Sequence, residues 1–356
     1  MQIRSRRLRI FSRVSESRTF DSGGTTLADV GEDVLLGLLS AAAGAPSDPG
    51  VVVPSGDDAA VVHVPLGLEL AVSQDALVEG KDFQRSWITP WQLGRRALAV
   101  ALSDIAGMGG EPAWCTATIC APASTQLDDV LAIHSGLRQA AVDAGCPLVG
   151  GDVSDIDGPL VLDVAVGGTG SPGSWLLRDA GMPGDLLVVS GRLGRAAAGL
   201  QLLLGAGVHV GGADRAAWLT AFLAPVPRVS EGRLLSGAGV RCGGDVSDGL
   251  LIDARRTAAA SGCAAELWLD TIPVDAALRV AFGDRWPDLA LGGGEDFELL
   301  AAASADRVDA LLRGWPGAAT PLTVVGRLVP GSEVQLLSAR GGEVLPPPRI
   351  TARHYL

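Results

Sequence analysis

Five short segments rich in glycine and aspartate constrain this chain most, because each falls where a predicted strand or helix begins or ends. They are Gly56-Asp57-Asp58, Ser73-Gln74-Asp75, Ser103-Asp104, Gly150-Gly151-Asp152 and Asp245-Val246-Ser247-Asp248-Gly249. One such aspartate alone is usually an Asx turn or a helix N-cap, and Asp248 is a candidate N-cap for the helix after it. Five together, in a chain with 4 histidines, favour a hard cation such as Mg²⁺, because oxygen ligands suit it better than zinc. Magnesium beside glycine turns implies a polyphosphate ligand.

The first part of the chain predicts a helix, a loop and a hairpin. Apolar residues recur with helical spacing over residues 29–43, and the Pro-, Ser- and Gly-rich stretch 44–56 reads as a loop. Two β-like runs, 59–64 and 68–73, predict a hairpin whose antiparallel pairing places Asp58 opposite Asp75. Opposed carboxylates destabilise a sheet unless a cation lies between them, which again indicates a metal.

Two further helices follow the hairpin. Thr89 is a candidate N-cap with proline at the first helical position, and this helix ends at the glycines of residues 107–110. Asp104 lies in its last turn, where a carboxylate opposes the helix dipole and therefore needs another reason to be present. The second helix spans about 127–144. Strands are predicted at 148–149 and 160–166, and residues 169–173 predict a domain junction.

The second half of the chain mixes strands and helices in the same way. This rhythm predicts an α+β protein of two domains and not a doubly wound parallel sheet. The predicted strands are 184–190, 241–247, 264–269, 297–303 and 322–328, and the predicted helices are 195–204, 228–236 and 249–260.

Composition and charge exclude several classes of function. The formal net charge is -12, and a protein that neutralises nucleic-acid phosphates should carry a basic face. The only lysine, Lys81, lacks the following Ser or Thr of a P-loop. The longest uncharged stretch, 196–213, is broken by glycines and predicts no membrane span. The 5 cysteines form no CxxC pair, which fits a cytoplasmic protein.

Residues 1–28 begin with an arginine-rich stretch that differs from the rest of the chain. It lacks the apolar region of a secretory signal. We interpret it as a disordered tail or a misassigned start. The alternative is an arm that binds nucleic acid or a membrane.

Six motifs taken together resemble the thiamine-monophosphate kinase family of the aminoimidazole ribonucleotide synthetase superfamily. They are GDDAAVV (56–62), SQDALVEGKDF (73–83), LGRRALAVALSDIAGMGGEP (93–112), LVGGD (148–152), DVSDGLLID (245–253) and LGGGEDFELL (291–300). The resemblance implies an N-terminal mixed sheet with helices over residues 29–170, which binds ATP and Mg²⁺ and forms a homodimer. It also implies a C-terminal α/β sandwich over residues 171–356 that completes the active site. The implied reaction is direct transfer of the γ-phosphoryl group of ATP to thiamine monophosphate.

The resemblance also implies roles for individual residues, several of them in the glycine- and aspartate-rich segments. It implies magnesium ligands at Asp58, Ser73, Gln74, Asp75, Asp104, Asp152, Asp245 and Asp248, with Asp75, Asp104 and Asp248 as catalytic candidates. It implies nucleotide contacts at Gly150, Gly151, Arg178, Ser247 and His134. Acceptor contacts are implied at Asp82, Glu295 and Ala352.

The departures from the family pattern lie on the acceptor side. Asp82 stands where the family has histidine before phenylalanine, and Ala352 stands where it has tryptophan near the C-terminus. Loss of an aromatic ring weakens binding of a flat cationic ring, although the Asp82 carboxylate could attract its charge. Two alternatives therefore remain: a kinase or ATP-activating synthetase of this superfamily with another small acceptor, and a nucleotide-binding protein without turnover.

Overall fold

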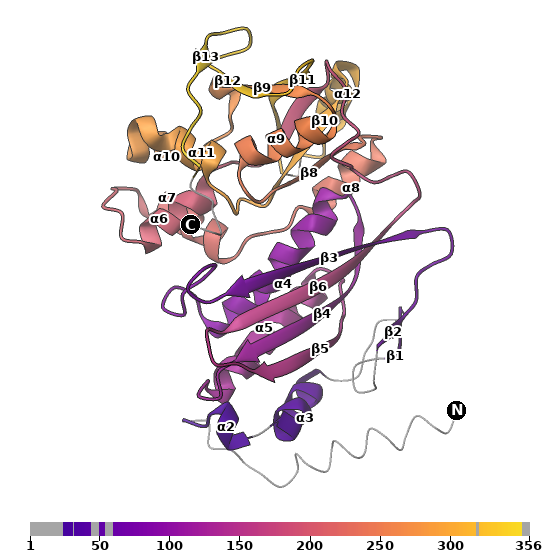
Figure 1. The fold of residues 1–356 in the computed structure, drawn as a ribbon, viewed down its shortest axis with the longest axis vertical. Helices are drawn as coiled ribbons and strands as arrows, with labels where there is room; N and C mark the ends of the chain where they lie inside the picture. Colours follow the sequence, from indigo (N-terminus) through magenta and orange to yellow (C-terminus); the bar gives the residue numbers. More distant parts are fainter. Residues whose placement is uncertain (1–23, 31, 44–49, 54–59, 318–319, 351–356) are drawn as a thin grey trace. The chain divides into compact units, whose positions relative to one another are not determined.

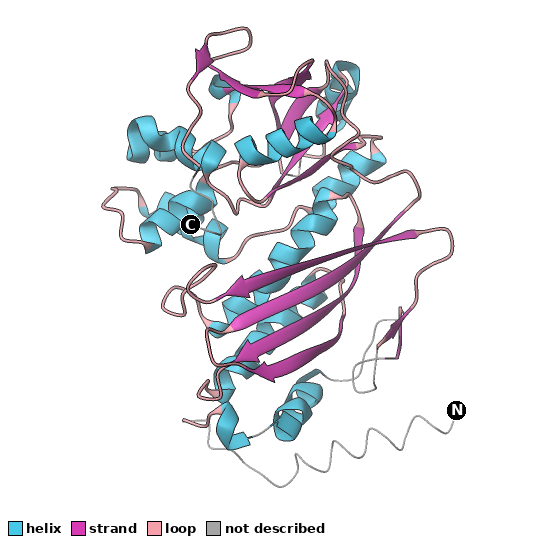
Figure 2. Ribbon diagram, in the orientation of Figure 1, coloured by secondary structure: helices cyan, strands magenta, loops and turns pink. Residues whose placement is uncertain are grey.

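A computed structural model describes residues 24–30, 32–43, 50–53, 60–317 and 320–350 of the chain. The chain divides into two compact units. The first comprises Met1–Leu66, Val72–Ala101 and Pro112–Gly167, and the second comprises Gly67–Ala71, Leu102–Glu111 and Gly168–Leu356. Helices and strands are mixed throughout the described residues (Figure 2), so the predicted α+β class is confirmed. None of the helices in the described ranges has the length and apolar character needed to cross a bilayer.

The first unit is built on a four-stranded sheet with helices on one face. Its elements, some of which extend past the unit's limits, are α2 (Leu27–Val30), α3 (Glu32–Ala43), β1 (Val51–Val53), β2 (Val61–Val62), β3 (Glu69–Val78), α4 (Pro90–Gly107), β4 (Glu111–Ala121), α5 (Leu127–Asp143), β5 (Leu148–Asp155) and β6 (Val161–Gly170). The strand order is β3-β6-β4-β5, and β4 runs parallel to β5. Helices α4 and α5 lie behind the sheet in Figure 1, and no described element covers the face turned toward the viewer.

Local sequence explains how α4 begins and how it packs on α5. The Thr89 N–H donates to Gln92 Oε1 at 3.1 Å and the Gln92 N–H donates to Thr89 Oγ1 at 3.3 Å, which is the reciprocal capping box. A Cβ at Gly94 would lie 1.9 Å from the carbonyl oxygen of Ile133, and one at Gly136 would lie 1.9 Å from that of Trp91. The two helices therefore pack backbone against backbone at these two glycines.

The predicted hairpin over residues 59–64 and 68–73 is wrong. Val62 pairs with Val51 instead, so β1 and β2 form a separate antiparallel sheet, while β3 belongs to the four-stranded sheet. The partner strand was hidden because three valines inside the Pro- and Gly-rich stretch 44–56 were taken as loop. Asp58, predicted to lie opposite Asp75, is outside the described residues.

The second unit is built on a seven-stranded sheet of order β13-β12-β9-β11-β7-β10-β8. Neighbouring strands of known register are antiparallel except β12 and β9, which are parallel. The strands are β7 (Leu186–Ser190), β8 (Cys242–Val246), β9 (Ala264–Trp268), β10 (Glu298–Ala303), β11 (Leu322–Val329), β12 (Val334–Leu337) and β13 (Val344–Leu345). The helices are α6 (Arg195–Leu203), α7 (Gly212–Leu223), α8 (Val229–Gly237), α9 (Leu250–Ala260), α10 (Ala276–Phe282), α11 (Trp286–Gly292) and α12 (Ala305–Gly314), with 3-10 turns η1 (Leu269–Thr271) and η2 (Gly283–Arg285).

Both faces of the seven-stranded sheet are covered, and β10 shows this directly. Leu300 belongs to a core cluster that includes α9 and α11, whereas Leu299 belongs to another that includes α8 and α12. Successive residues of a strand point to opposite faces, so helices pack on both sides. The predicted C-terminal α/β sandwich is confirmed. The five predicted strands correspond to β7 to β11, and the three predicted helices correspond to α6, α8 and α9.

Candidate functional site

Four carboxylates of the second unit, Asp104, Asp245, Asp248 and Asp253, form what we call the acidic cluster. Asp245, near the end of β8, is buried and accepts a hydrogen bond of 2.8 Å from the Ser103 hydroxyl. A Cβ at Gly107 would lie 2.7 Å from the Asp245 backbone nitrogen. Glycine therefore allows the last turn of α4 to lie directly on β8. This contact brings the Asp104 carboxylate beside that of Asp245. Asp104 opposes the helix dipole at the end of α4, and its place in the acidic cluster explains why a carboxylate is there.

Two carboxylates of the acidic cluster, Asp245 and Asp253, have raised pKa values. Burial, followed by the charge of Asp104, raises the pKa of Asp245 to about 6. Burial, followed by the charges of Asp245 and Asp248, raises the pKa of Asp253 to about 7. Like charges held this closely are stabilised by a bound cation.

Asp248 is held in place by the helix that follows it. Its backbone N–H donates to Asp253 Oδ2 at 3.1 Å, and Arg256 Nη1 donates to Asp253 Oδ1 at 3.1 Å. The same Arg256 nitrogen forms an ion pair with the Asp248 carboxylate. The prediction of Asp248 as an N-cap is wrong, because the N-cap of α9 is Gly249 with φ 100°. A φ of this value favours glycine. The helix therefore begins after Gly249, one residue later than predicted.

The donor atoms of the acidic cluster are carboxylate oxygens, which suit Mg²⁺. Within the described ranges, however, no three His, Cys, Asp or Glu side chains are arranged so that they alone could hold a metal ion. The other predicted magnesium ligands belong to the first unit (Ser73, Gln74, Asp75 and Asp152) or lie outside the described residues (Asp58).

The three predicted magnesium ligands on β3 do not all point to the same face of the four-stranded sheet. Ser73 and Asp75 are half-buried and alternate with the exposed Gln74, so they point to the opposite face of the sheet. Gln74 Nε2 donates to both carboxylate oxygens of Asp163 at 2.8 Å. The Gln74 side chain is therefore engaged on the uncovered face, and only its backbone carbonyl could serve a cation on the side of Asp75.

The predicted nucleotide residues are also divided between the units. In the second unit, the charge of Arg178 offsets part of the rise in pKa that burial causes at Asp245, and Ser247 Oγ donates to Asp245 Oδ1 at 3.5 Å. In the first unit, Gly150 and Gly151 lie on β5, and a Cβ at Gly151 would lie 2.0 Å from the Ala117 carbonyl oxygen. Gly151 thus has a packing reason to be glycine.

His134 lies on α5, in the first unit. Burial and the neighbouring charge of Arg138 lower its pKa to about 4, so its imidazole is neutral at pH 7. A neutral imidazole supplies no cationic charge to a nucleotide phosphate, but it can still form hydrogen bonds.

Two predicted acceptor residues lie in turns with defined backbone contacts. Asp82 Oδ2 accepts the Val78 N–H at 2.7 Å, so this carboxylate closes the turn after β3. The Glu295 N–H donates to the Ser247 carbonyl at 2.8 Å, and Glu295 has φ 68°. A non-glycine residue in this left-handed region is strained, which is common at ligand sites. Ala352 lies outside the described residues.

Comparisons with known proteins cover most of the chain. Residues 56–171 match the family of AIR synthase related proteins in its N-terminal domain, and residues 182–337 match its C-terminal domain. The thiamine-monophosphate kinase of Bacillus subtilis (strain 168) is 33% identical over 272 residues, which cover 76% of this chain and 83% of that protein. The chain belongs to the thiamine-monophosphate kinase family. The resemblance drawn from the six motifs is therefore confirmed.

Solved structures of the thiamine-monophosphate kinase family share this fold. The crystal structure of the enzyme from Stenotrophomonas maltophilia K279a has a TM-score of 0.76 and 35% identity, over 85% of this chain and 95% of that one. A structure described as AaThiL complexed with AMPPCP and TMP has a TM-score of 0.69 and 28% identity, over 92% of this chain and 98% of that one.

Sequence reasoning missed three residues that organise the site in this member of the thiamine-monophosphate kinase family. Ser103 and Asp253 were inside the recognised motifs but had no role assigned to them, and Arg256 lies just beyond one. The spacing of Asp253 and Arg256, three residues apart on a helix, is a usable signal for an ion pair. No pattern in the sequence could indicate that this pair also holds Asp248.

Proposed function

We propose that this chain transfers the γ-phosphoryl group of ATP to thiamine monophosphate and so forms thiamine diphosphate. Membership of the thiamine-monophosphate kinase family supports this reaction, and a neighbour of the same fold was solved with AMPPCP and TMP. The observation that carries the proposal is the acidic cluster, where burial and neighbouring carboxylates raise the pKa of Asp245 and Asp253, because carboxylates gathered in this way suit a protein that handles cation-bound phosphates.

Magnesium is the cation we propose for this site, where it would bridge and neutralise phosphate oxygens. Asp104, Asp245 and Asp248 of the second unit and Ser73, Gln74, Asp75 and Asp152 of the first are its proposed ligands, together with Asp58. Asp75, Asp104 and Asp248 are the proposed catalytic residues. Gly150, Gly151, Arg178, Ser247 and His134 are proposed to contact the nucleotide, and Asp82, Glu295 and Ala352 the acceptor.

The proposed chemistry is a direct displacement. An oxygen of the acceptor phosphate forms a bond to the γ-phosphorus while the bond from that phosphorus to the β–γ bridging oxygen breaks, and ADP leaves. Such a transition state is loose and needs positioning and charge neutralisation more than a covalent nucleophile. Ser103 and Arg256 have the supporting task of holding Asp245 and Asp248 in place.

A homodimer in the cytoplasm is the proposed form of the protein. The uncovered face of the four-stranded sheet supports dimer formation, since Val72 on this face is 62% exposed. The 5 cysteines, all free, suit a reducing compartment.

Release of ADP from Mg-ATP by the full chain tests the proposed reaction. The acceptor panel contains thiamine monophosphate, thiamine and unrelated phosphate monoesters, with the diphosphate product identified by mass. We expect turnover that depends on thiamine monophosphate. We also expect at least a 100-fold lower kcat in Asp75→Asn, because a cation that loses one carboxylate ligand is held less firmly where it neutralises the charge of the transferred phosphoryl group. Asp309→Asn, an exposed carboxylate on α12, is the matched control and should retain full activity.

Each other outcome of this assay selects a different conclusion. Turnover with another acceptor only would favour a related kinase or synthetase. Binding of ATP without turnover on any acceptor would favour a nucleotide-binding protein. An active Asp75→Asn variant would remove that residue from the catalytic set.

A further inference from the structure

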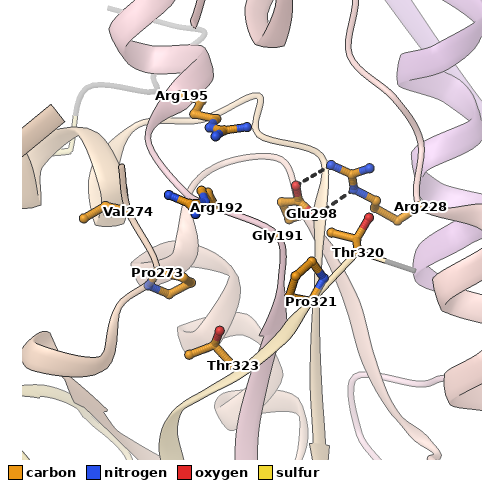
Figure 3. A pocket seen from close by; sticks show the side chains of 10 residues that line it. All are labelled: Gly191, Arg192, Arg195, Arg228, Pro273, Val274, Glu298, Thr320, Pro321 and Thr323. Atoms are coloured by element: carbon orange, nitrogen blue, oxygen red, sulfur yellow. Dashed lines mark hydrogen bonds and ion pairs between the residues drawn. The ribbon is translucent and has the colours of Figure 1, made fainter. Parts of the chain in front are cut away.

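A pocket of the second unit lies at the edge of the seven-stranded sheet where β7 ends and β10 and β11 begin (Figure 3). Its volume is about 380 Å³. Three arginines, one glutamate and two threonines line it together with proline, valine and glycine. None of its lining residues belongs to the acidic cluster or to the predicted site. The described structure therefore contains a polar cavity to which the proposed phosphoryl transfer assigns no role.

The walls of this pocket are tied together by the backbone of one loop. Gly191 donates its N–H to the Pro321 carbonyl at 2.9 Å, and Leu193 donates to the Pro273 carbonyl at 2.8 Å. Gly191 has φ 62°, and a Cβ there would lie 2.0 Å from Glu298 Oε1. Only glycine fits both this φ and the space beside Glu298. The conformation of the loop at the pocket therefore depends on glycine at position 191.

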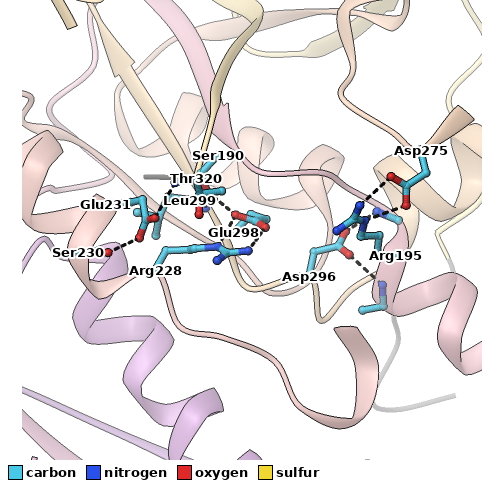
Figure 4. Close-up of polar contacts among 12 residues, drawn as sticks. Ser190, Arg195, Arg228, Ser230, Glu231, Asp275, Asp296, Glu298, Leu299 and Thr320 are labelled. Atoms are coloured by element: carbon cyan, nitrogen blue, oxygen red, sulfur yellow. Dashed lines mark hydrogen bonds and ion pairs between the residues drawn. The ribbon is translucent and has the colours of Figure 1, made fainter. Parts of the chain in front are cut away.

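The glutamate of the pocket is already neutralised. Arg228 donates to Glu298 through Nε at 2.8 Å and Nη2 at 2.6 Å, and the Ser190 hydroxyl donates to it at 2.5 Å (Figure 4). A bidentate guanidinium pair of this kind is the strongest common partner of a carboxylate. Glu298 and Arg228 therefore contribute no net charge to the pocket.

The other two arginines share a single carboxylate. Arg195 donates to both oxygens of Asp275 at 2.8 Å, and Arg192 donates to Oδ1 at 2.9 Å. The Asp275 side chain is 7% exposed, whereas those of Arg192 and Arg195 are 53% and 37% exposed. Two guanidinium groups on one carboxylate leave one positive charge at the pocket wall. Asp296 lies near Arg195 but offsets this charge only in part, because burial raises the pKa of Asp296 to about 7.

We propose that this pocket binds a small molecule with a phosphate monoester group, its phosphate held by Arg192 and Arg195. The planar guanidinium matches the spacing of phosphate oxygens and stays charged at every physiological pH. Asp275 fixes both groups before the ligand arrives, which lowers the entropy that binding must remove. Pro273, Val274 and Pro321 supply an apolar wall for the rest of the molecule.

Calorimetric titration of the full chain with phenyl phosphate and with inorganic phosphate tests the proposal. Excess EDTA and the absence of nucleotide prevent cation-bridged binding at the acidic cluster. We expect saturable binding of phenyl phosphate, tighter than that of inorganic phosphate, and at least a tenfold higher Kd in Arg192→Gln. Arg233→Gln is the matched control, because Arg233 is also 53% exposed and pairs with one carboxylate, Glu111, outside the pocket.

Three results would overturn the proposal. The first is no saturable binding of either probe to the wild type, and the second is equal weakening in Arg192→Gln and Arg233→Gln, which would mean only general charge screening. The third is a tenfold higher KM for thiamine monophosphate in Arg192→Gln, which would assign the pocket to the acceptor. Val274→Asp, with its fold checked by near-UV circular dichroism, is a second variant that should also abolish binding, because it adds a negative charge to the wall.

Discussion

At the scale of single residues, the second unit treats its buried carboxylates in two ways. Asp275 forms ion pairs with Arg192 and Arg195, and Glu298 forms one with Arg228. Asp245 and Asp296 are instead held by hydroxyl or backbone N–H groups, and burial raises the pKa of both. The first kind belongs to the architecture of the arginine pocket. The second kind is able to change its charge near neutral pH, and it has a measurable consequence for stability.

Asp296 should make the metal-free protein less stable as pH rises from 5 to 8. Its pKa is raised from the ordinary 3.8 to about 7 in the folded chain, so the folded state binds more protons than the unfolded state between these values. The free energy of unfolding therefore falls with pH through this window, by a few kcal/mol at most, and levels off above it. Asp296→Asn should reduce this loss, because the amide does not ionise.

Urea unfolding in EDTA at pH 5 and pH 8 measures the effect of Asp296. Carboxylates whose pKa is lowered, such as Asp275, titrate below this window and do not disturb the comparison. Asp245 and Asp253 act in the same direction, so the variant should retain part of the slope. An identical pH dependence in wild type and Asp296→Asn would show that Asp296 ionises normally.

Single residues of the site could be predicted from sequence only where a motif carried them. Asp104, Asp245 and Asp248 come from motifs, and the structure brings Asp104 beside Asp245. Asp253 and Arg256 could not be assigned in the same way, because their role depends on the angle at which α9 leaves Gly249. That angle follows from a backbone conformation and not from the order of residue types.

At the scale of elements, the contact between α4 and α5 depends on two glycines. Gly136→Ala should lower the free energy of unfolding by about 1–3 kcal/mol, because the new methyl group would overlap the Trp91 carbonyl and force the helices apart. Thermal unfolding of the full chain measures the loss. Gly37→Ala in α3 is the control: its Cβ would meet nothing within 4 Å, so helix propensity should stabilise it by roughly 0.5–1 kcal/mol. Equal stability of the two variants would contradict backbone contact.

Local sequence signals predicted where most helices and strands lie, but they did not predict which strands pair with each other. The capping box at Thr89 marks the start of one helix and Gly145 marks the end of the other by short-range chemistry, and both helices are confirmed. Strand β4 was missed because its mixture of Ala, Thr and Cys has no clean alternation. The hairpin error has a similar cause: a proline–glycine turn indicates that the chain reverses, but not which strand will be the partner.

At the scale of the whole molecule, the two sheets differ in how their faces are covered. The seven-stranded sheet buries both faces under helices, and every residue of β10 is buried. The four-stranded sheet has α4 and α5 on one face, while the other presents Val72, Gln74 and the indole of Trp114. An antiparallel or mixed sheet can leave one face in water, but the exposed valine on that face favours contact with another protein surface.

A charge placed on this uncovered face should break the proposed homodimer. In a two-fold interface each substitution occurs twice, so Val72→Lys would bring two buried ammonium groups into the contact and raise the dimer Kd by at least 100-fold. Sedimentation equilibrium over a range of protein concentrations measures this change. Val142→Lys is the matched control, since Val142 is 70% exposed but lies on α5, the helix that covers the opposite face. A wild type that sediments as a monomer, or a Val72→Lys variant that dimerises as tightly as Val142→Lys, would place any self-association elsewhere.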